Sequence, residues 1–175
     1  MRKFFLLLSI AVSALLPAHL WGQNTSTEEV TASARILTAI ELTKVTDLHF
    51  GTMVSTNSPG ACMVPATGED RSATGGVTLL DQTPAYTRAY FTVSGDISAT
   101  YSIALPEDET VTISYHDGAT THSMDVNGFS HSAGVSPALD ASGAADFYVG
   151  ASLSVSANQP PGLYQGSFNV TVAYE

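Results

Sequence analysis

The sequence predicts an all-β protein folded as an antiparallel β-sandwich, and three observations predict it. Apolar residues recur at every second position in several segments, turn-forming residues such as those at 57–60, 74–76 and 158–162 separate these segments, and after residue 22 no window keeps a helical spacing. A spacing of two places the apolar side chains on one face of a half-buried strand. Many short strands with regular turn signals are typical of a sandwich. The alternating segments are 30–36, 89–93, 101–105, 111–115, 147–157 and 164–174.

Residues 1–22 have the features of a secretory signal peptide. Arg2 and Lys3 give a positive start, residues 4–16 form a mostly apolar run, and Pro17 begins a helix-breaking exit. The run is shorter than the roughly 20 apolar residues that a membrane-spanning helix needs. We therefore expect an exported protein without direct membrane insertion, cleaved after Gly22 or after Ala18, that reaches the periplasm and then the cell surface or the medium.

The rest of the chain is expected to form one domain. Residues 23–29 are polar and lack a packing pattern, which indicates a flexible N-terminal arm. No repeat or linker divides residues 30–175, so they are expected to form a single β-sandwich domain. Cys62 is the one cysteine and can close no internal disulfide. Because it lies in a short apolar run, we expect it to behave as a small hydrophobic residue, with a reactive or intermolecular thiol as the alternative.

The charge balance argues against nucleic-acid partners. The chain has 6 Lys and Arg against 16 Asp and Glu, a formal net charge of −10. Without residues 1–22, which hold two of the basic residues, the balance is 4 against 16, or −12. Such a surface repels phosphate backbones, because affinity for them comes largely from Lys and Arg.

No catalytic or metal-binding pattern stands out, so we expect no enzyme activity, cofactor or metal. Nucleophile-elbow, zinc-protease, paired-cysteine and phosphate-loop motifs are all missing from the sequence. His116, His122 and His131 cluster in a polar region with Asp117 and Asp125, and converging imidazoles can hold zinc or nickel. Their spacings of six and nine fit no strand register that would bring all three together, which favours surface histidines.

The end of the chain resembles a known motif. Gly162 stands fourteenth from the C-terminus and Tyr174 second, with alternating apolar residues between them. This resembles the C-terminal strand of subunits assembled by the chaperone–usher pathway. The wider chain is similar to the spore coat protein U type of secreted pilin-like domain. It also resembles an uncharacterised bacterial exported family that shares Phe50-Gly51-Thr52, residues 73–80 and residues 157–159, and this similarity spans about residues 29–174.

The resemblance implies an immunoglobulin-like, Greek-key sandwich that lacks one strand and has a hydrophobic groove beside its C-terminal strand. A periplasmic chaperone fills this groove first, and an outer-membrane usher then lets the N-terminal arm of another copy or a related subunit insert as the missing strand. The assembly strand implied here comprises Gly162, Tyr164, Gly166, Phe168, Val170, Val172 and Tyr174.

The donor segment implied by the resemblance lies near the N-terminus. Val30, Ala32, Ala34 and Ile36 have the required period of two, although the same stretch fits equally the first strand of the domain itself. We therefore expect a structural surface protein, a pilus- or fimbria-like subunit assembled by donor-strand exchange. The alternative is a self-complete exported sandwich whose loops bind a glycan, a metal or a protein.

Overall fold

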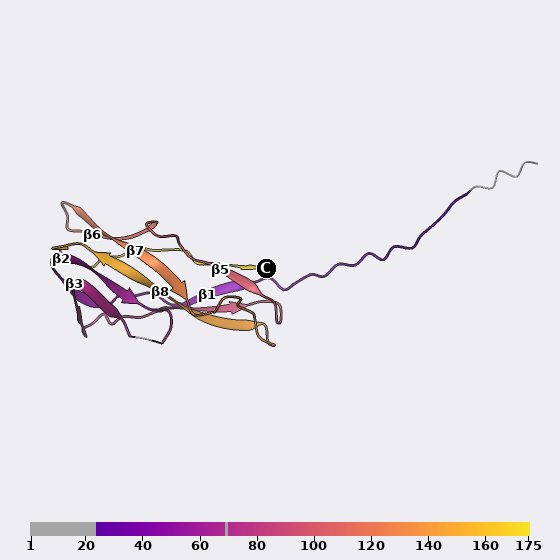
Figure 1. Ribbon diagram of the computed structural model, residues 1–175, viewed down its shortest axis with the longest axis horizontal. Coiled ribbons are helices and arrows are strands. Elements are labelled where there is room, and N and C mark those ends of the chain that lie inside the picture. Colours follow the sequence, from indigo (N-terminus) through magenta and orange to yellow (C-terminus); the bar gives the residue numbers. More distant parts are fainter. Residues whose placement is uncertain (1–23, 69) are drawn as a thin grey trace, which may run out of the picture. The chain divides into compact units, whose positions relative to one another are not determined.

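The structure is a computed structural model that describes residues 24–68 and 70–175 (Figure 1). The all-β prediction is confirmed, because the described residues form nine strands and no helix. These strands make antiparallel sheets of seven and two strands, as in a β-sandwich. The expected signal peptide lies outside the described residues, and within them no helix is long and apolar enough to cross a membrane. The immunoglobulin-like and Greek-key details stay predictions.

The strands have the following bounds. They are β1 (Glu41–Thr46), β2 (Thr52–Val64), β3 (Ser72–Leu80), β4 (Ala89–Ser94), β5 (Tyr101–Ala104), β6 (Val111–His116), β7 (Thr121–His131), β8 (Ala144–Val155) and β9 (Thr171–Tyr174).

The chain divides into two units, residues 1–35 and residues 36–175. Within the first unit, residues 24–35 carry no strand and are exposed. Val30, Ala32, Ala34 and Ile36, the expected donor or first strand, all precede β1 and are exposed. The structure thus begins its first sheet at Glu41, eleven residues after the alternating pattern begins at Val30.

Strand β8 is the centre of the large sheet. Its first half pairs with β4 and its second half with β2, while β7 pairs with residues 149–153. The strand order is β1-β4-β8-β2-β3, and β6 joins through β7. In the second sheet β9 pairs with β5, and Figure 1 shows the end of the chain beside β5. The last strand is therefore separate from β8, and residues 156–170 connect the two.

The β2–β3 ribbon folds back on itself. Arg71, just before β3, donates a hydrogen bond to the carbonyl oxygen of Leu80, the last residue of β3. A straight strand of this length would separate those positions by roughly 30 Å, which no arginine side chain spans. The strand bends at Gly75, whose φ of 64° is accessible mainly to glycine, and the register of β2 shifts between Ser55 and Gly60. The fold-back brings the two ends of β3 close together.

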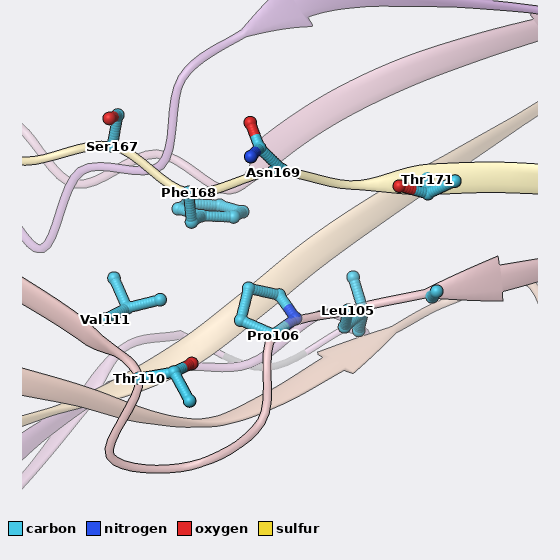
Figure 2. A pocket seen from close by; sticks show the side chains of 9 residues that line it. Leu105, Pro106, Thr110, Val111, Ser167, Phe168, Asn169 and Thr171 are labelled. Carbon is cyan, nitrogen blue, oxygen red and sulfur yellow. The ribbon is translucent and has the colours of Figure 1, made fainter.

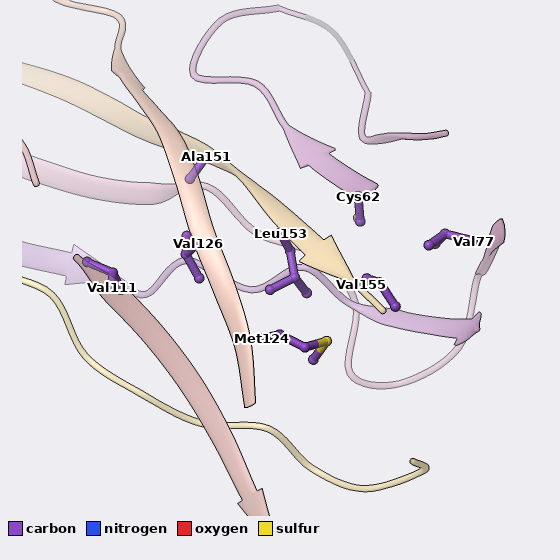
Figure 3. Packing of buried hydrophobic residues seen from close by; sticks show 8 residues of the cluster. All are labelled: Cys62, Val77, Val111, Met124, Val126, Ala151, Leu153 and Val155. Carbon is purple, nitrogen blue, oxygen red and sulfur yellow. The ribbon is translucent and has the colours of Figure 1, made fainter. Parts of the chain in front are cut away.

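Two clusters of buried apolar side chains form the core. Figure 3 shows the first, in which Met124, Leu153 and Val155 turn toward one another. Cys62 is fully buried in this cluster, as expected of a small hydrophobic residue, and burial raises the pKa of its thiol. The first cluster comprises Cys62, Val77, Val111, Met124, Val126, Ala151, Leu153 and Val155. The second comprises Ala89, Phe91, Val93, Tyr101, Leu139, Phe147 and Val149.

Truncating Leu153 should destabilise the domain strongly. Its side chain is buried in the first cluster, so Leu153→Ala removes apolar contacts and leaves a cavity, at a cost of about 2–5 kcal/mol in the free energy of unfolding. Ser154→Ala, on the exposed face of the same strand, should change it by less than about 0.5 kcal/mol. Urea denaturation measures both values, and equal losses would contradict this placement of the core.

Candidate functional site

A large groove lies between two segments that are far apart in the sequence. Its first wall is residues 47–55 and its second wall is residues 158–170. Its volume of about 1240 Å³ exceeds the range of roughly 300–1,000 Å³ that is usual for small-molecule sites. The candidate site is therefore large enough for a stretch of polypeptide.

The floor of the groove is the apolar core itself. The floor side chains come from both clusters, and each exposes less than a tenth of its surface. A molecule seated in the groove would contact this core directly and would remove from water the half-buried apolar side chains of the walls. The buried floor residues are Ala89, Phe91, Val111, Met124, Val126, Leu153 and Val155.

The two walls run in opposite directions and are tied together at one end, and a second tie joins the chain beyond their other ends. At one end the Ser55 hydroxyl donates to the carbonyl oxygen of Gln159 at 3.0 Å. Toward the other end, beyond the walls themselves, the Tyr174 hydroxyl donates to the carbonyl oxygen of Thr38 at 2.7 Å. Between these ties the groove separates the walls, so its outline is fixed while its middle stays open.

The second wall is paired along little of its length. The amide and carbonyl of Gln165 each bond to Ser114 of β6 at 2.9 Å. Among the described residues no backbone hydrogen bond joins residues 166–170 to another segment. The wall approaches β6 closely, because a Cβ at Gly166 would lie 2.6 Å from the carbonyl oxygen of Thr112. Residues 166–170 therefore present unpaired backbone groups, as an edge strand does.

Phe168 anchors this unpaired stretch. Its ring packs on both core clusters, and its centroid lies 4.8 Å from that of Phe129. A second, smaller cavity of about 350 Å³ lies between the second wall and the loop from β5 to β6. Figure 2 shows the Phe168 ring turned toward the part of this loop that carries Pro106. Packing of one aromatic side chain thus holds the wall where strand pairing is missing.

The residues implied as the assembly strand divide into two groups. The five apolar ones are half-buried and alternate with exposed neighbours. The groove is lined by Gly162, Tyr164, Gly166, Phe168 and Val170. Val172 and Tyr174 do not line it and lie instead in β9, where they pair with Ile103 and Tyr101 of β5.

The first wall was not predicted from the sequence. Leu48 and Phe50 are partly buried and pack on the core, and the backbone of His49 bonds to Thr87 in both directions at 2.9 Å. Arg71, the buried charged residue of the described part of the chain, donates to the carbonyl oxygen of Phe50. The shared Phe50-Gly51-Thr52 motif was a signal for this wall, but its position beside residues 158–170 has no local sequence signature.

His116, His122 and His131 do not converge on one point. His116 and His122 lie on β6 and β7 of one hairpin, and His131 ends β7. Within residues 24–68 and 70–175, no group of three or more His, Cys, Asp or Glu side chains is placed to hold a metal ion. The His122 ring lies 3.0 Å from the Asp117 carboxylate instead. His116 and His122 thus flank the turn of the β6–β7 hairpin, whereas His131 lies at the other end of β7.

Asp117 organises that turn through its ionised side chain. The backbone amides of Thr120 and Ala119 donate to its carboxylate at 2.8 and 2.9 Å. Together with the His122 ring, these hydrogen bonds lower the pKa of Asp117 to about 2. A lowered pKa means that ionised Asp117 stabilises the fold at pH values above its unfolded value of 3.8, and that this contribution is lost as the pH falls through about 2.

Asp117→Asn should therefore destabilise the protein in a pH-dependent way. We expect a lower urea midpoint than that of the wild type at pH 6, because the neutral amide accepts weaker hydrogen bonds. The difference should shrink between about pH 4 and pH 2 as Asp117 becomes protonated. Urea titrations at several pH values measure it, and a difference that does not change with pH would contradict this assignment.

Comparison with known proteins bears on both walls of the groove. No curated protein and no solved structure gives a significant match to the chain. A family model described as Domain of unknown function (DUF4402) matches residues 40–174. The matched segment begins just before β1, ends with β9 and contains both walls. Because the match covers most of the sequence, the chain belongs to this DUF4402 family.

Proposed function

We propose that this protein is a structural subunit of a bacterial surface fibre, pilus- or fimbria-like, whose groove accepts an extended strand from another subunit. The observation that carries the proposal is the open apolar groove along the unpaired second wall. It accords with the C-terminal motif, in which Gly162 and Tyr174 mark the two ends of the alternating segment.

An extended strand suits this groove better than a compact ligand does. Its backbone can bond to the unpaired groups of residues 166–170, and every second side chain can point to the apolar floor. The first wall has nine residues, a length of about 30 Å in extended form. A donor of seven residues, about 23 Å long, therefore fits between the two ties at the ends of the groove.

The donor that we propose is residues 30–36 of a neighbouring copy. Val30 and Ile36 are 85% and 93% exposed, which is unusual for apolar side chains of this size. Burial of such a side chain contributes about 1.5–3 kcal/mol. The segment has the alternation that one strand needs to present a single apolar face, and it carries no strand of its own.

The same proposal covers localisation and partners. The chain is exported through the signal-like residues 1–22, a periplasmic chaperone covers the groove before assembly, and an outer-membrane usher directs the exchange at the cell surface. An open apolar groove needs such a cover, because large exposed apolar surfaces promote aggregation. Catalysis and cofactors have no part in this role.

A charge on the donor segment should block assembly without harming the fold. Val30→Asp places a carboxylate where the neighbouring groove is apolar, whereas the exposed side chain makes little contribution within its own subunit. We expect the wild-type chain, starting at Gln23, to form linear oligomers in sedimentation experiments and V30D to stay monomeric with an unchanged circular dichroism spectrum. Because assembly stabilises the folded state, V30D should melt at a lower temperature than the assembled wild type.

Thr31→Asp is the matched control, because it adds the same charge on the other side of the strand. It should assemble as the wild type does. If the wild type stays monomeric at every concentration, the proposed function is wrong, and the self-complete binding module becomes the better reading.

A charge in the groove of the acceptor subunit should also block assembly. Val170 lines the groove and packs on the second core cluster, so Val170→Asp places a charge against the donor side chains. We expect loss of oligomers, and Asn169→Asp, at an exposed neighbouring position, should retain them. Circular dichroism of both variants checks that the sandwich is folded, and fibres from folded V170D would contradict the placement of the donor.

A further inference from the structure

We infer that Arg71 is a positioning residue that holds the first wall in the shape required to accept a strand. The effect of Arg71 on assembly rests on the proposed function, whereas its effect on the shape of the first wall does not. The inference starts from the position of Arg71 outside the groove, behind the Phe50-Gly51-Thr52 stretch of the wall.

The guanidinium of Arg71 joins three backbone carbonyls. One nitrogen, Nη1, donates to Phe50 at 2.9 Å and to Thr52 at 3.2 Å, and the other, Nη2, donates to Leu80. Phe50 and Thr52 belong to the wall, and Leu80 ends the strand that has folded back. One side chain therefore ties the wall to both ends of β3.

These carbonyls take the place of water around the buried guanidinium of Arg71. The side chain is 5% exposed, and Asp81 lies 3.6 Å away but is fully exposed, so water weakens that ion pair. A buried cation without a buried anion must be satisfied by hydrogen bonds. The ring of Tyr86 lies 5.3 Å from the guanidinium and adds a cation–π contact. Because the carbonyls satisfy the cation, the wall and Arg71 hold each other in place.

A lysine at position 71 cannot make the same set of hydrogen bonds. A guanidinium is planar and presents several donors in fixed directions, whereas an ammonium group is a single compact charge. Two carbonyls of one extended segment and one of another match the guanidinium fork. We therefore expect the conservative change Arg71→Lys to keep the charge and release the wall.

Cys62 provides a reporter of this release. It is the only cysteine of the chain, is fully buried, and its thiol donates to the same Phe50 carbonyl oxygen at 3.8 Å. Movement of residues 47–51 of the wall away from Cys62 would uncover the thiol while the rest of the sandwich stays folded. Local opening of this kind differs from global unfolding because it depends only weakly on urea.

The experiment measures the rate at which a thiol reagent labels Cys62 in the full chain at increasing urea. In R71K we expect labelling without urea to be at least about tenfold faster than in the wild type, because the loss of one hydrogen bond to a charged donor changes an equilibrium by about that factor. The labelling rate of R71K should depend only weakly on urea, because the opening is local. Arg88→Lys is the matched control. Its guanidinium lies 5.9 Å over the ring of Tyr148, a residue of β8 that does not line the groove, and its labelling should equal that of the wild type.

A milder variant keeps the test decisive where R71K does not fold. Tyr86→Leu removes the ring over the guanidinium but leaves the three hydrogen bonds, so it should accelerate labelling by a smaller factor. The inference is overturned if the folded variants label at the wild-type rate, or if their labelling rises with urea as steeply as global unfolding does.

Sedimentation of the same variants separates this inference from the proposed function. R71K should need a higher concentration than wild type and R88K to form oligomers, because its wall is not preformed. If the wild type forms none, the proposed function fails, and Cys62 labelling still decides the role of Arg71. If R71K labels rapidly yet assembles as the wild type does, Arg71 holds the wall without affecting the acceptor.

Discussion

The missing pairing of residues 166–170 is the constraint on which the rest of this structure depends. A sandwich buries its core by closing a strand over each side, and here the last segment pairs with β6 at Gln165 and with β5 only from Thr171 onward. The core beneath it is therefore closed by side chains such as Phe168 instead of by a complete sheet. These backbone groups face solvent or the groove and have no protein partner, so, like those of an edge strand, they can pair with an added strand.

Half of this architecture can be predicted from the sequence. The period of two locates β4, β5, β6, β8 and β9, because each has one buried and one exposed face. The same signal fails at residues 30–36, where it is present without a strand, and at β1, where most side chains are exposed and no alternation is visible. Periodicity reports which strands cover a core, so an edge strand that covers little core gives little signal.

The two walls of the groove also differ in how well the sequence predicts them. The second wall is predictable because Tyr164, Phe168 and Val170 alternate along one segment. The first wall depends on a fold-back at Gly75 that brings Arg71 to Phe50, and no local pattern encodes a contact across twenty-one residues. Residues 57–60 have turn chemistry but lie within β2, because the bend occurs inside a ribbon that stays paired on both sides of it.

Preformed walls decide whether a weakly apolar donor can bind at all. Ordering one residue of a flexible segment costs about 1–2 kcal/mol, while one main-chain hydrogen bond returns about 0.5–1.5 kcal/mol. Two of the four inward positions of residues 30–36 are alanines, which add little burial, so Val30 and Ile36 must supply most of the rest. The binding free energy of such a segment is too small to order a flexible groove as well. Ties made before binding, by Arg71 on one wall and by Tyr174 near the end of the other, remove that cost from the acceptor.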